Sequence, residues 1–170
     1  MIKLKILTDG NADLGTARLP NIVAGHPQHY ALTIWQPWCS AIVQGPKRIE
    51  NRGWRPPEWI IGKRIWLHAG KRFDLPGSLR CAKLGFDRAK ADLPLGAIIG
   101  SARVGGFQTD EMPKAKMFSR EGWLYEGADL RQDPWWVGPV GWVLEEVLPL
   151  EPEAALGMQK LWVWPHGAGP

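Results

Sequence analysis

Long apolar runs are missing from this chain of 170 residues. No stretch approaches the roughly 20 apolar residues that a membrane-spanning helix requires. The segment Met1–Gly10 contains lysines, but it has no long apolar core and no small-residue cleavage site behind it, so a secretory signal is not expected. The sequence therefore predicts a protein that does not contact a membrane and is located in the cytoplasm.

Cysteine is also scarce. The two cysteines, Cys39 and Cys81, are too few for a disulfide framework and fit a reducing environment. The four histidines show no zinc-ligand spacing, and the sequence contains neither a phosphate-binding loop nor a dinucleotide-binding fingerprint. We therefore expect no metal and no cofactor.

The composition is that of a folded globular domain, with 45% apolar and 22% charged residues. A chain of this length suits one domain with a substantial core. Residues 1–28 carry Gly, Asn, Pro and Asp without a sustained period, and we interpret them as an N-terminal extension with room for one edge strand at Ile2–Leu7. Residues 29–170 form the predicted domain.

Short strands outnumber helices in the expected order of elements. The expected strands are residues 30–35, 47–54, 63–69, 96–104, 139–150 and 161–164. The expected helices are residues 37–44 and 77–90, and residues 108–133 are expected to hold a short helix and a long loop. This pattern predicts an α+β domain built on a small barrel or a strongly bent sheet.

Basic residues are concentrated between Lys47 and Arg72. This segment holds eight Lys and Arg against two Glu, a local balance of +6 in a chain whose net charge is +4. Five of the eleven tryptophans lie in or beside it: Trp35, Trp38, Trp54, Trp59 and Trp66. Indole faces stack on bases and guanidinium groups bind phosphates, so the interleaving favours a nucleic acid partner. A solvated basic face with ordinary core tryptophans is the alternative interpretation.

Ordered motifs from Tyr30 to Trp164 resemble the ASCH (activating signal cointegrator homology) family. Gln36-Pro37-Trp38 is similar to the family's helix start, and Gly45, Lys47 and Arg52 match its Gly-x-Lys-x-x-x-x-Arg signature. Downstream, the segment 62–71 resembles the family's Ile-His-Ala strand, and 157–162 its closing Gly-x-x-x-Leu-Trp. The resemblance implies a PUA-like fold, a small β-barrel flanked by helices with a cleft over one face.

The resemblance also implies a class of function. Relatives of this fold bind RNA or read modified bases, so the leading hypothesis is recognition of RNA, of another single-stranded nucleic acid or of a modified nucleoside. The alternatives are a metal-independent ribonuclease, a nucleoside amidohydrolase, and a protein-interaction domain of the coregulator type. In the acetylcytidine amidohydrolase branch a threonine nucleophile stands three residues after the lysine, whereas this chain has Glu50 there. That departure argues against the same mechanism.

Individual candidates follow from side-chain chemistry and from the motif. Lys47 suits a phosphate contact or a catalytic amine, Glu50 an acceptor for the amino group of a base, and His68 acid–base work. The candidate catalytic residues are Lys47, Glu50 and His68. The candidate nucleic-acid contacts are Trp38, Ser40, Lys47, Arg52, Trp54, Arg55 and Arg64. We expect Lys47 and Arg52 to be exposed and nearly neutral for stability, and Trp38 to be a buried core indole.

Overall fold

The computed structural model describes residues 29–165. The strands are β1 (Tyr30–Gln36), β2 (Ile49–Arg52), β3 (Arg64–Phe73), β4 (Ala97–Thr109), β5 (Lys116–Phe118), β6 (Leu124–Glu126), β7 (Val140–Ala154) and β8 (Leu161–Val163). The α-helices are α1 (Trp38–Val43) and α2 (Leu75–Lys83). Three short 3₁₀ turns are η1 (Glu58–Ile60), η2 (Lys90–Asp92) and η3 (Leu130–Gln132). This mostly β content with a few helices confirms the α+β class.

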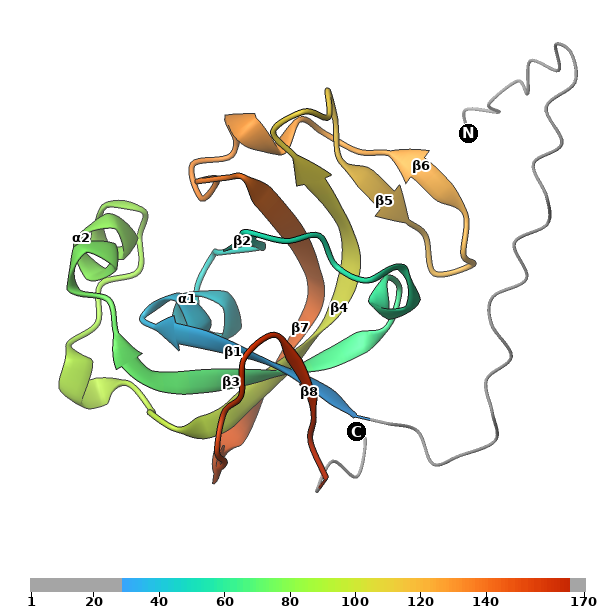
Figure 1. Ribbon diagram of the computed structural model, residues 1–170. Helices are drawn as coiled ribbons and strands as arrows, with labels where there is room; N and C mark the ends of the chain where they lie inside the picture. The colour runs from blue at the N-terminus through green and yellow to red at the C-terminus, as the bar shows by residue number, and fades with distance from the viewer. Residues whose placement is uncertain (1–28, 166–170) are drawn as a thin grey trace, which may run out of the picture.

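One curled sheet makes up most of the fold (Figure 1). Its strand order is β2-β7-β4-β3-β1-β8, and the β5–β6 hairpin extends from β4. Strands β1 and β3 run parallel, while β4 and β7 form a long antiparallel ribbon. The register between β4 and β7 shifts at several points, and such bulges bend a sheet and increase its twist. The ribbon therefore curves and carries β2 round toward β1.

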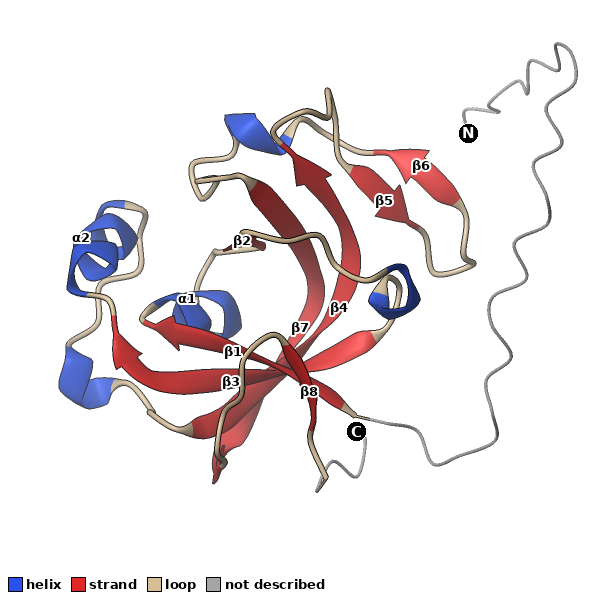
Figure 2. Cartoon of the chain, viewed as in Figure 1, coloured by secondary structure: helices blue, strands red, loops and turns tan. Residues whose placement is uncertain are grey.

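The core fills the concave side of this curl, where α1 also lies (Figure 2). Trp142 of β7 is fully buried there among aliphatic side chains from β1, β3 and β4. Its indole Nε1 donates to the backbone carbonyl of Trp54 at 3.0 Å, so the buried ring leaves no polar atom without a partner. This contact ties the loop after β2 to the centre of the core.

The curl does not close into a barrel of continuous backbone pairing. Strand β8 pairs with β1 at Tyr30, Ala31 and Leu32, and the register ends there. Beyond that point Arg52 of β2 reaches across and donates from Nη2 to the carbonyl oxygen of Thr33 at 2.6 Å. Of the two predicted forms, a small barrel or a strongly bent sheet, the structure has the bent sheet, because a side chain joins β2 to β1 where a closed barrel has strand pairing. We call this gap the seam.

Two expectations about the elements need correction. Helix α2 begins and ends earlier than predicted, because Asp74 accepts from the backbone N–H of Gly77 at its N-terminus and Gly85, with φ of 89°, follows its end. The predicted loop over 108–133 contains the short strands β5 and β6. The edge strand expected at Ile2–Leu7 lies outside the described residues. Within residues 29–165 no helix is long and apolar enough to cross a membrane.

Candidate functional site

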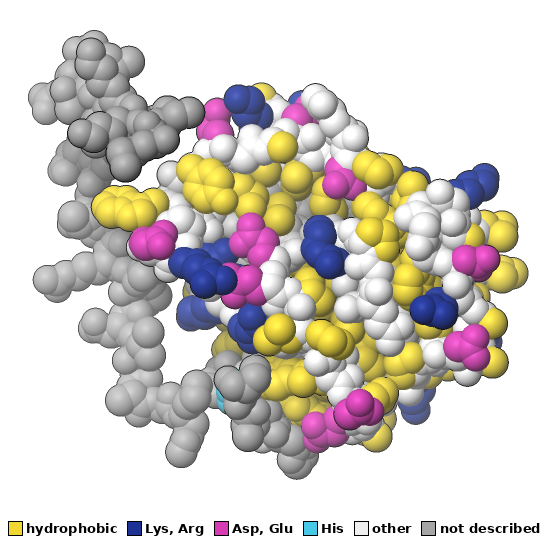
Figure 3. Space-filling view, turned by 180° about the vertical axis from the view of Figure 1, so that it is seen from behind, with side chains coloured by type: hydrophobic (Ala, Val, Ile, Leu, Met, Phe, Trp, Pro, Cys, Tyr) yellow, Lys and Arg dark blue, Asp and Glu magenta, His cyan; other side chains and the backbone are white. Residues whose placement is uncertain are grey.

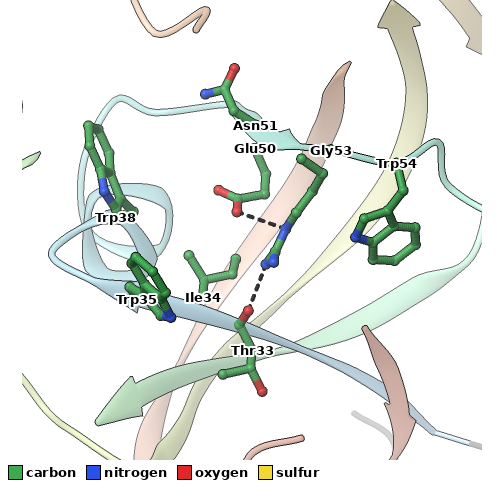
Figure 4. Close-up of a pocket in the computed structure, with 9 residues that line it drawn as sticks. Thr33, Ile34, Trp35, Trp38, Glu50, Asn51, Gly53 and Trp54 are labelled. Atoms are coloured by element: carbon green, nitrogen blue, oxygen red, sulfur yellow. Dashed lines mark hydrogen bonds and ion pairs between the residues drawn. The ribbon is translucent and has the colours of Figure 1, made fainter. Parts of the chain in front are cut away.

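A pocket of about 350 Å³ opens at the seam between β1 and β2 (Figure 4). Its lining residues come from β1, from α1 and from β2 with the loop that follows: Thr33, Ile34, Trp35, Trp38, Glu50, Asn51, Arg52, Gly53 and Trp54. The volume is at the small end of the range for ligand sites. We call it the seam pocket.

The floor of the seam pocket is a buried carboxylate held between two cations. Lys47 Nζ lies 2.7 Å from Glu50 Oε2, and Arg52 Nε lies 3.1 Å from Glu50 Oε1. The side chain of Lys47 is 1% exposed and that of Glu50 is 7% exposed. The Arg52 N–H is not aligned for a hydrogen bond to Oε1, so that contact is mainly Coulombic. The three side chains carry one net positive charge.

Local structure fixes the carboxylate in place. The backbone N–H of Lys47 donates to the carbonyl of Ala41 at 3.1 Å, which turns the chain from α1 directly into β2. On β2, Asn51 donates to the carbonyl of Trp135 and accepts from the backbone N–H of Val137. Side chains alternate along a strand, so Glu50 points into the seam pocket away from this anchor.

Three tryptophans form the walls, with Trp35 and Trp38 on one side and Trp54 on the other (Figure 4). Trp38 donates from Nε1 to Asp74 Oδ2 at 2.9 Å. Trp54 stands edge-on to Trp142, with ring centroids 4.7 Å apart. Trp38 and Trp54 are both half-buried, so their positions are fixed while part of each ring faces the pocket. The expectation that Trp38 is fully buried is therefore wrong.

Two further compartments adjoin the seam pocket. Beyond Trp54 lies a hollow of about 320 Å³, and beyond Trp38 lies one of about 210 Å³. The first is lined by Trp54, Pro57, Trp59, Lys160 and Leu161. The second is lined by Trp38, Lys47, Glu50, Asn51, Asp74 and Val137. Trp54 and Trp38 therefore each form a wall that two compartments share.

The structure brings together five of the residues singled out in the sequence: Trp38, Lys47, Glu50, Arg52 and Trp54. Arg48, which lies between Lys47 and β2, donates to the carbonyls of Ile42, Gly45 and Lys47. The expectation that Lys47 is exposed is wrong, because its side chain is buried. Its Nζ lies 5.9 Å from the centroid of the Trp38 ring.

Ser40 and Arg55 lie outside the seam pocket. Ser40 is fully buried, and its hydroxyl accepts from Gln36 Nε2 at 2.7 Å, which is a contact within the core. Arg55 is exposed beside Trp54 and lies 3.8 Å from the carboxylate of Glu111. Ser40 therefore has a structural role, whereas Arg55 is an exposed residue that follows Trp54 in the chain.

His68 and Arg64 lie on the opposite face of β3 from the core. His68 donates from Nε2 to the carbonyl of Ala155 at 3.1 Å and stands edge-on to Trp162. Burial lowers the pKa of His68, against the opposing effect of the hydrogen bond to Ala155. Arg64 donates to Ser101 and to the carbonyl of Glu146. Neither side chain lines the seam pocket, so acid–base work there by His68 is not supported.

Trp35 lines the seam pocket and Arg72 lies over its ring, although neither is among the candidates predicted from the sequence. The Arg72 guanidinium carbon lies 3.8 Å from the centroid of the Trp35 ring, and both side chains are exposed. The signal was present, because strand alternation places Trp35 opposite the core residue Ile34. Tryptophan is highly buried on average, so an indole at an outward strand position indicates a surface site.

The basic segment does not form one continuous patch. Glu50 and Glu146 neutralise several of its cations, and cationic and acidic side chains are interspersed on the face seen from behind in Figure 3. Two cations without an ion pair in residues 29–165 each lie over an exposed tryptophan, Arg72 over Trp35 and Lys63 over Trp59. The predicted interleaving of basic and aromatic groups is therefore local to the pockets.

No nucleophile is evident in the described lining of the seam pocket. The Thr33 hydroxyl accepts from Trp162 Nε1 at 3.1 Å on the other face of the sheet. Burial, reinforced by the carboxylate of Glu50, raises the pKa of the Cys39 thiol, so the reactive thiolate is disfavoured.

Comparison with known proteins identifies the family of this chain. The model of the ASCH domain family matches residues 32–152, most of the chain. The solved structure of ASCH from Zymomonas mobilis is similar, with 17% identity and a TM-score of 0.45 over 82% of this chain and 89% of that chain. A serine-to-alanine mutant of that protein gives 16% identity and a TM-score of 0.44 over the same shares. A search of curated proteins found no match. On the extent of the family match, this chain belongs to the ASCH domain family.

Proposed function

We propose that this protein binds single-stranded RNA, or another single-stranded nucleic acid, by taking one base into the seam pocket. The observation that carries the proposal is the buried Glu50 carboxylate, held by Lys47 and Arg52, at the floor of a pocket walled by tryptophans. Aromatic walls accept any base by stacking, while a fixed polar group at the floor reads its edge.

Glu50 selects among bases by hydrogen bonding. Its carboxylate accepts and cannot donate while it is ionised, so it suits the exocyclic amino group of cytosine, adenine or guanine and not the carbonyl of uracil at the same position. The contacts with Lys47 and Arg52 hold the carboxylate at the floor of the seam pocket. A base with an exocyclic amino group, modified or not, is therefore the ligand that we propose for this pocket.

Backbone contacts come from the rim and not from the floor. Lys47 is enclosed and already paired with Glu50, so it orients the carboxylate rather than holding a phosphate. Arg72, which lies over Trp35, and Arg55, which follows Trp54 in the chain, are both exposed, and the two tryptophans line the seam pocket. These guanidinium groups are placed to hold the phosphates that flank an inserted base.

Hydrolysis is the competing function of the same site. A ribonuclease or amidohydrolase needs a nucleophile or a general acid and base near the scissile bond. Glu50 and Lys47 are the ionisable pair within reach, but they are joined to each other at 2.7 Å. Binding without turnover therefore accounts for the geometry with fewer rearrangements.

A single experiment separates these functions. The purified protein is incubated with a short single-stranded RNA in EDTA and examined by native and denaturing gel electrophoresis. We expect retardation of the intact RNA and no cleavage products. Cleavage would establish the ribonuclease, and neither retardation nor cleavage would overturn the proposal. Glu50→Gln serves as the site variant, and Glu145→Gln, which alters another paired carboxylate outside the pocket, as its control.

A further inference from the structure

We infer that the hollow beyond Trp54 is a second base subsite, which holds the nucleotide next to the one in the seam pocket. The inference rests on the proposed function and deepens it, since it makes the preferred ligand an oligonucleotide rather than a free nucleoside. The hollow has a volume of about 320 Å³, close to that of the seam pocket, and Trp54 is a wall of both.

The walls of this subsite suit the flat, apolar face of a base. Trp54 and Trp59 contribute indoles, while Pro57 and Leu161 contribute aliphatic surface. Trp59 is 38% exposed, although one part of its ring packs on Tyr30 with centroids 4.5 Å apart. That packing holds the indole in place and leaves the exposed part available to a ligand, which lowers the entropy cost of stacking.

The charges at the rim suit a phosphate. Lys160 lines the hollow, and Lys63 Nζ lies 5.9 Å from the centroid of the Trp59 ring. Neither lysine has a carboxylate partner among the ion pairs of residues 29–165. A hollow with apolar walls, one unpaired lysine in its lining and a second over the Trp59 ring matches a nucleotide better than it matches an apolar peptide side chain.

The two compartments repeat one arrangement. In the seam pocket a cation, Arg72, lies over an exposed tryptophan, Trp35. At the second subsite Lys63 Nζ lies 5.9 Å from the centroid of the Trp59 ring, a longer distance than the 3.8 Å between Arg72 and Trp35. Since Trp54 lines both compartments, its indole contacts two successive bases. The nucleic acid backbone crosses the edge of Trp54 between these two bases. This is the repeated pattern of stacking platform and cation found in single-strand binders.

The test compares ligands of one and two nucleotides with equal charge. The probes are the 3′- and 5′-methyl esters of cytidine monophosphate and the dinucleotides CpA and ApC, each with one negative charge, titrated by calorimetry. We expect one dinucleotide to bind roughly 5- to 150-fold more tightly than the matching ester, the gain typical of one stacked base. Dinucleotides that bind within about twofold of the esters would overturn the subsite.

Variants assign the gain to the second subsite. Trp59→Leu keeps apolar bulk against Tyr30 but removes the aromatic face, so it should abolish the dinucleotide gain and leave ester affinity unchanged. Trp59→Phe should keep most of the gain. Trp123→Ala, which alters a 74% exposed tryptophan outside the pockets, is the matched control and should change neither. Equal losses for ester and dinucleotide in Trp59→Leu would show a structural role and overturn the inference.

A direct optical readout completes the design. In CpA and ApC the adenine is replaced by 2-aminopurine, whose fluorescence falls when it stacks on an indole. Quenching that is present in the wild-type protein and lost in Trp59→Leu places the base in the subsite. If the esters bind and the dinucleotides gain nothing, the proposed function stands and the subsite fails. If no probe binds, both fail.

Discussion

The ammonium of Lys47 lies 2.7 Å from Oε2 of Glu50, and this pair is almost completely removed from solvent. A buried pair of this kind contributes little net stability, but removal of one partner strands the other charge in a medium that solvates it poorly. The position of the Glu50 carboxylate therefore depends on Lys47. In the proposed function, Lys47 acts by positioning Glu50.

Substitution of Lys47 by methionine should destabilise the fold. The change leaves the Glu50 carboxylate with Arg52 alone, at a cost on the order of 3 kcal/mol. Urea unfolding followed by circular dichroism measures it. The double variant Lys47→Met/Glu50→Leu should recover much of the stability, because both charges are gone, yet it should not bind a base. A single variant as stable as the wild type would contradict the burial of this pair.

Glu50→Gln should weaken discrimination between cytidine and uridine monophosphates. The amide replaces one acceptor oxygen by a donor, so the preference for an amino-bearing edge should fall by roughly 1–3 kcal/mol. Calorimetric titration of both ligands gives the ratio of affinities. Glu145→Gln, a paired carboxylate outside the pocket, is the control and should leave the ratio unchanged. A ratio that stays the same in Glu50→Gln would exclude base reading by this residue.

Salt dependence tests the rim. Binding of single-stranded RNA should weaken as salt rises, with a slope of about −0.7 for each phosphate contacted. Arg72→Ala should reduce the magnitude of that slope by the value of about one phosphate contact. Its melting temperature should stay that of the wild type, since exposed charges contribute little to folding. Arg120→Ala, which removes an exposed arginine paired with Glu146, is the comparison. Identical slopes in the wild type and Arg72→Ala would remove Arg72 from the phosphate contacts.

Acid should destabilise the protein through His68. Its pKa is lowered in the fold from 6.5, chiefly by burial, so the unfolded chain binds more protons as the pH falls through 6.5. Stability is therefore lost below that pH, until the folded imidazole also titrates. Urea midpoints measured between pH 7 and pH 5 should show a smaller loss in His68→Gln than in the wild type. RNA affinity corrected for unfolding should show no dependence on His68, since this residue lies outside the pocket.

Residues whose roles are local were predictable from the sequence. The Gln36-Pro37-Trp38 start of α1, the strand that follows Lys47, and the α+β class follow from capping, turn and periodicity patterns that extend over a few residues. The association of Trp54 with Glu50 and Arg52 follows in the same way, because the three are almost adjacent in the chain.

Contacts between distant segments were not predictable in this way. The burial of Lys47 depends on the curl of β4 and β7, which places β2 over the core, and charge patterning cannot show it. His68 alternates correctly with Leu67, but alternation alone does not tell which face of β3 carries the site. The hairpin of β5 and β6 consists of two three-residue strands, too short to give a periodic signal.

The seam has a consequence for the dynamics of the fold. At this place the sheet is joined by one guanidinium, from Arg52 to the carbonyl of Thr33, and not by a ladder of amides. Backbone segments with few partners open most readily, so amide hydrogen exchange should be fast in the loop after Arg52. In the proposed function, a base lodged between β1 and β2 contacts both strands and closes the gap between them. Binding of the base and closure of the sheet then occur together. Slower amide hydrogen exchange in both β1 and β2 on binding would show this coupling.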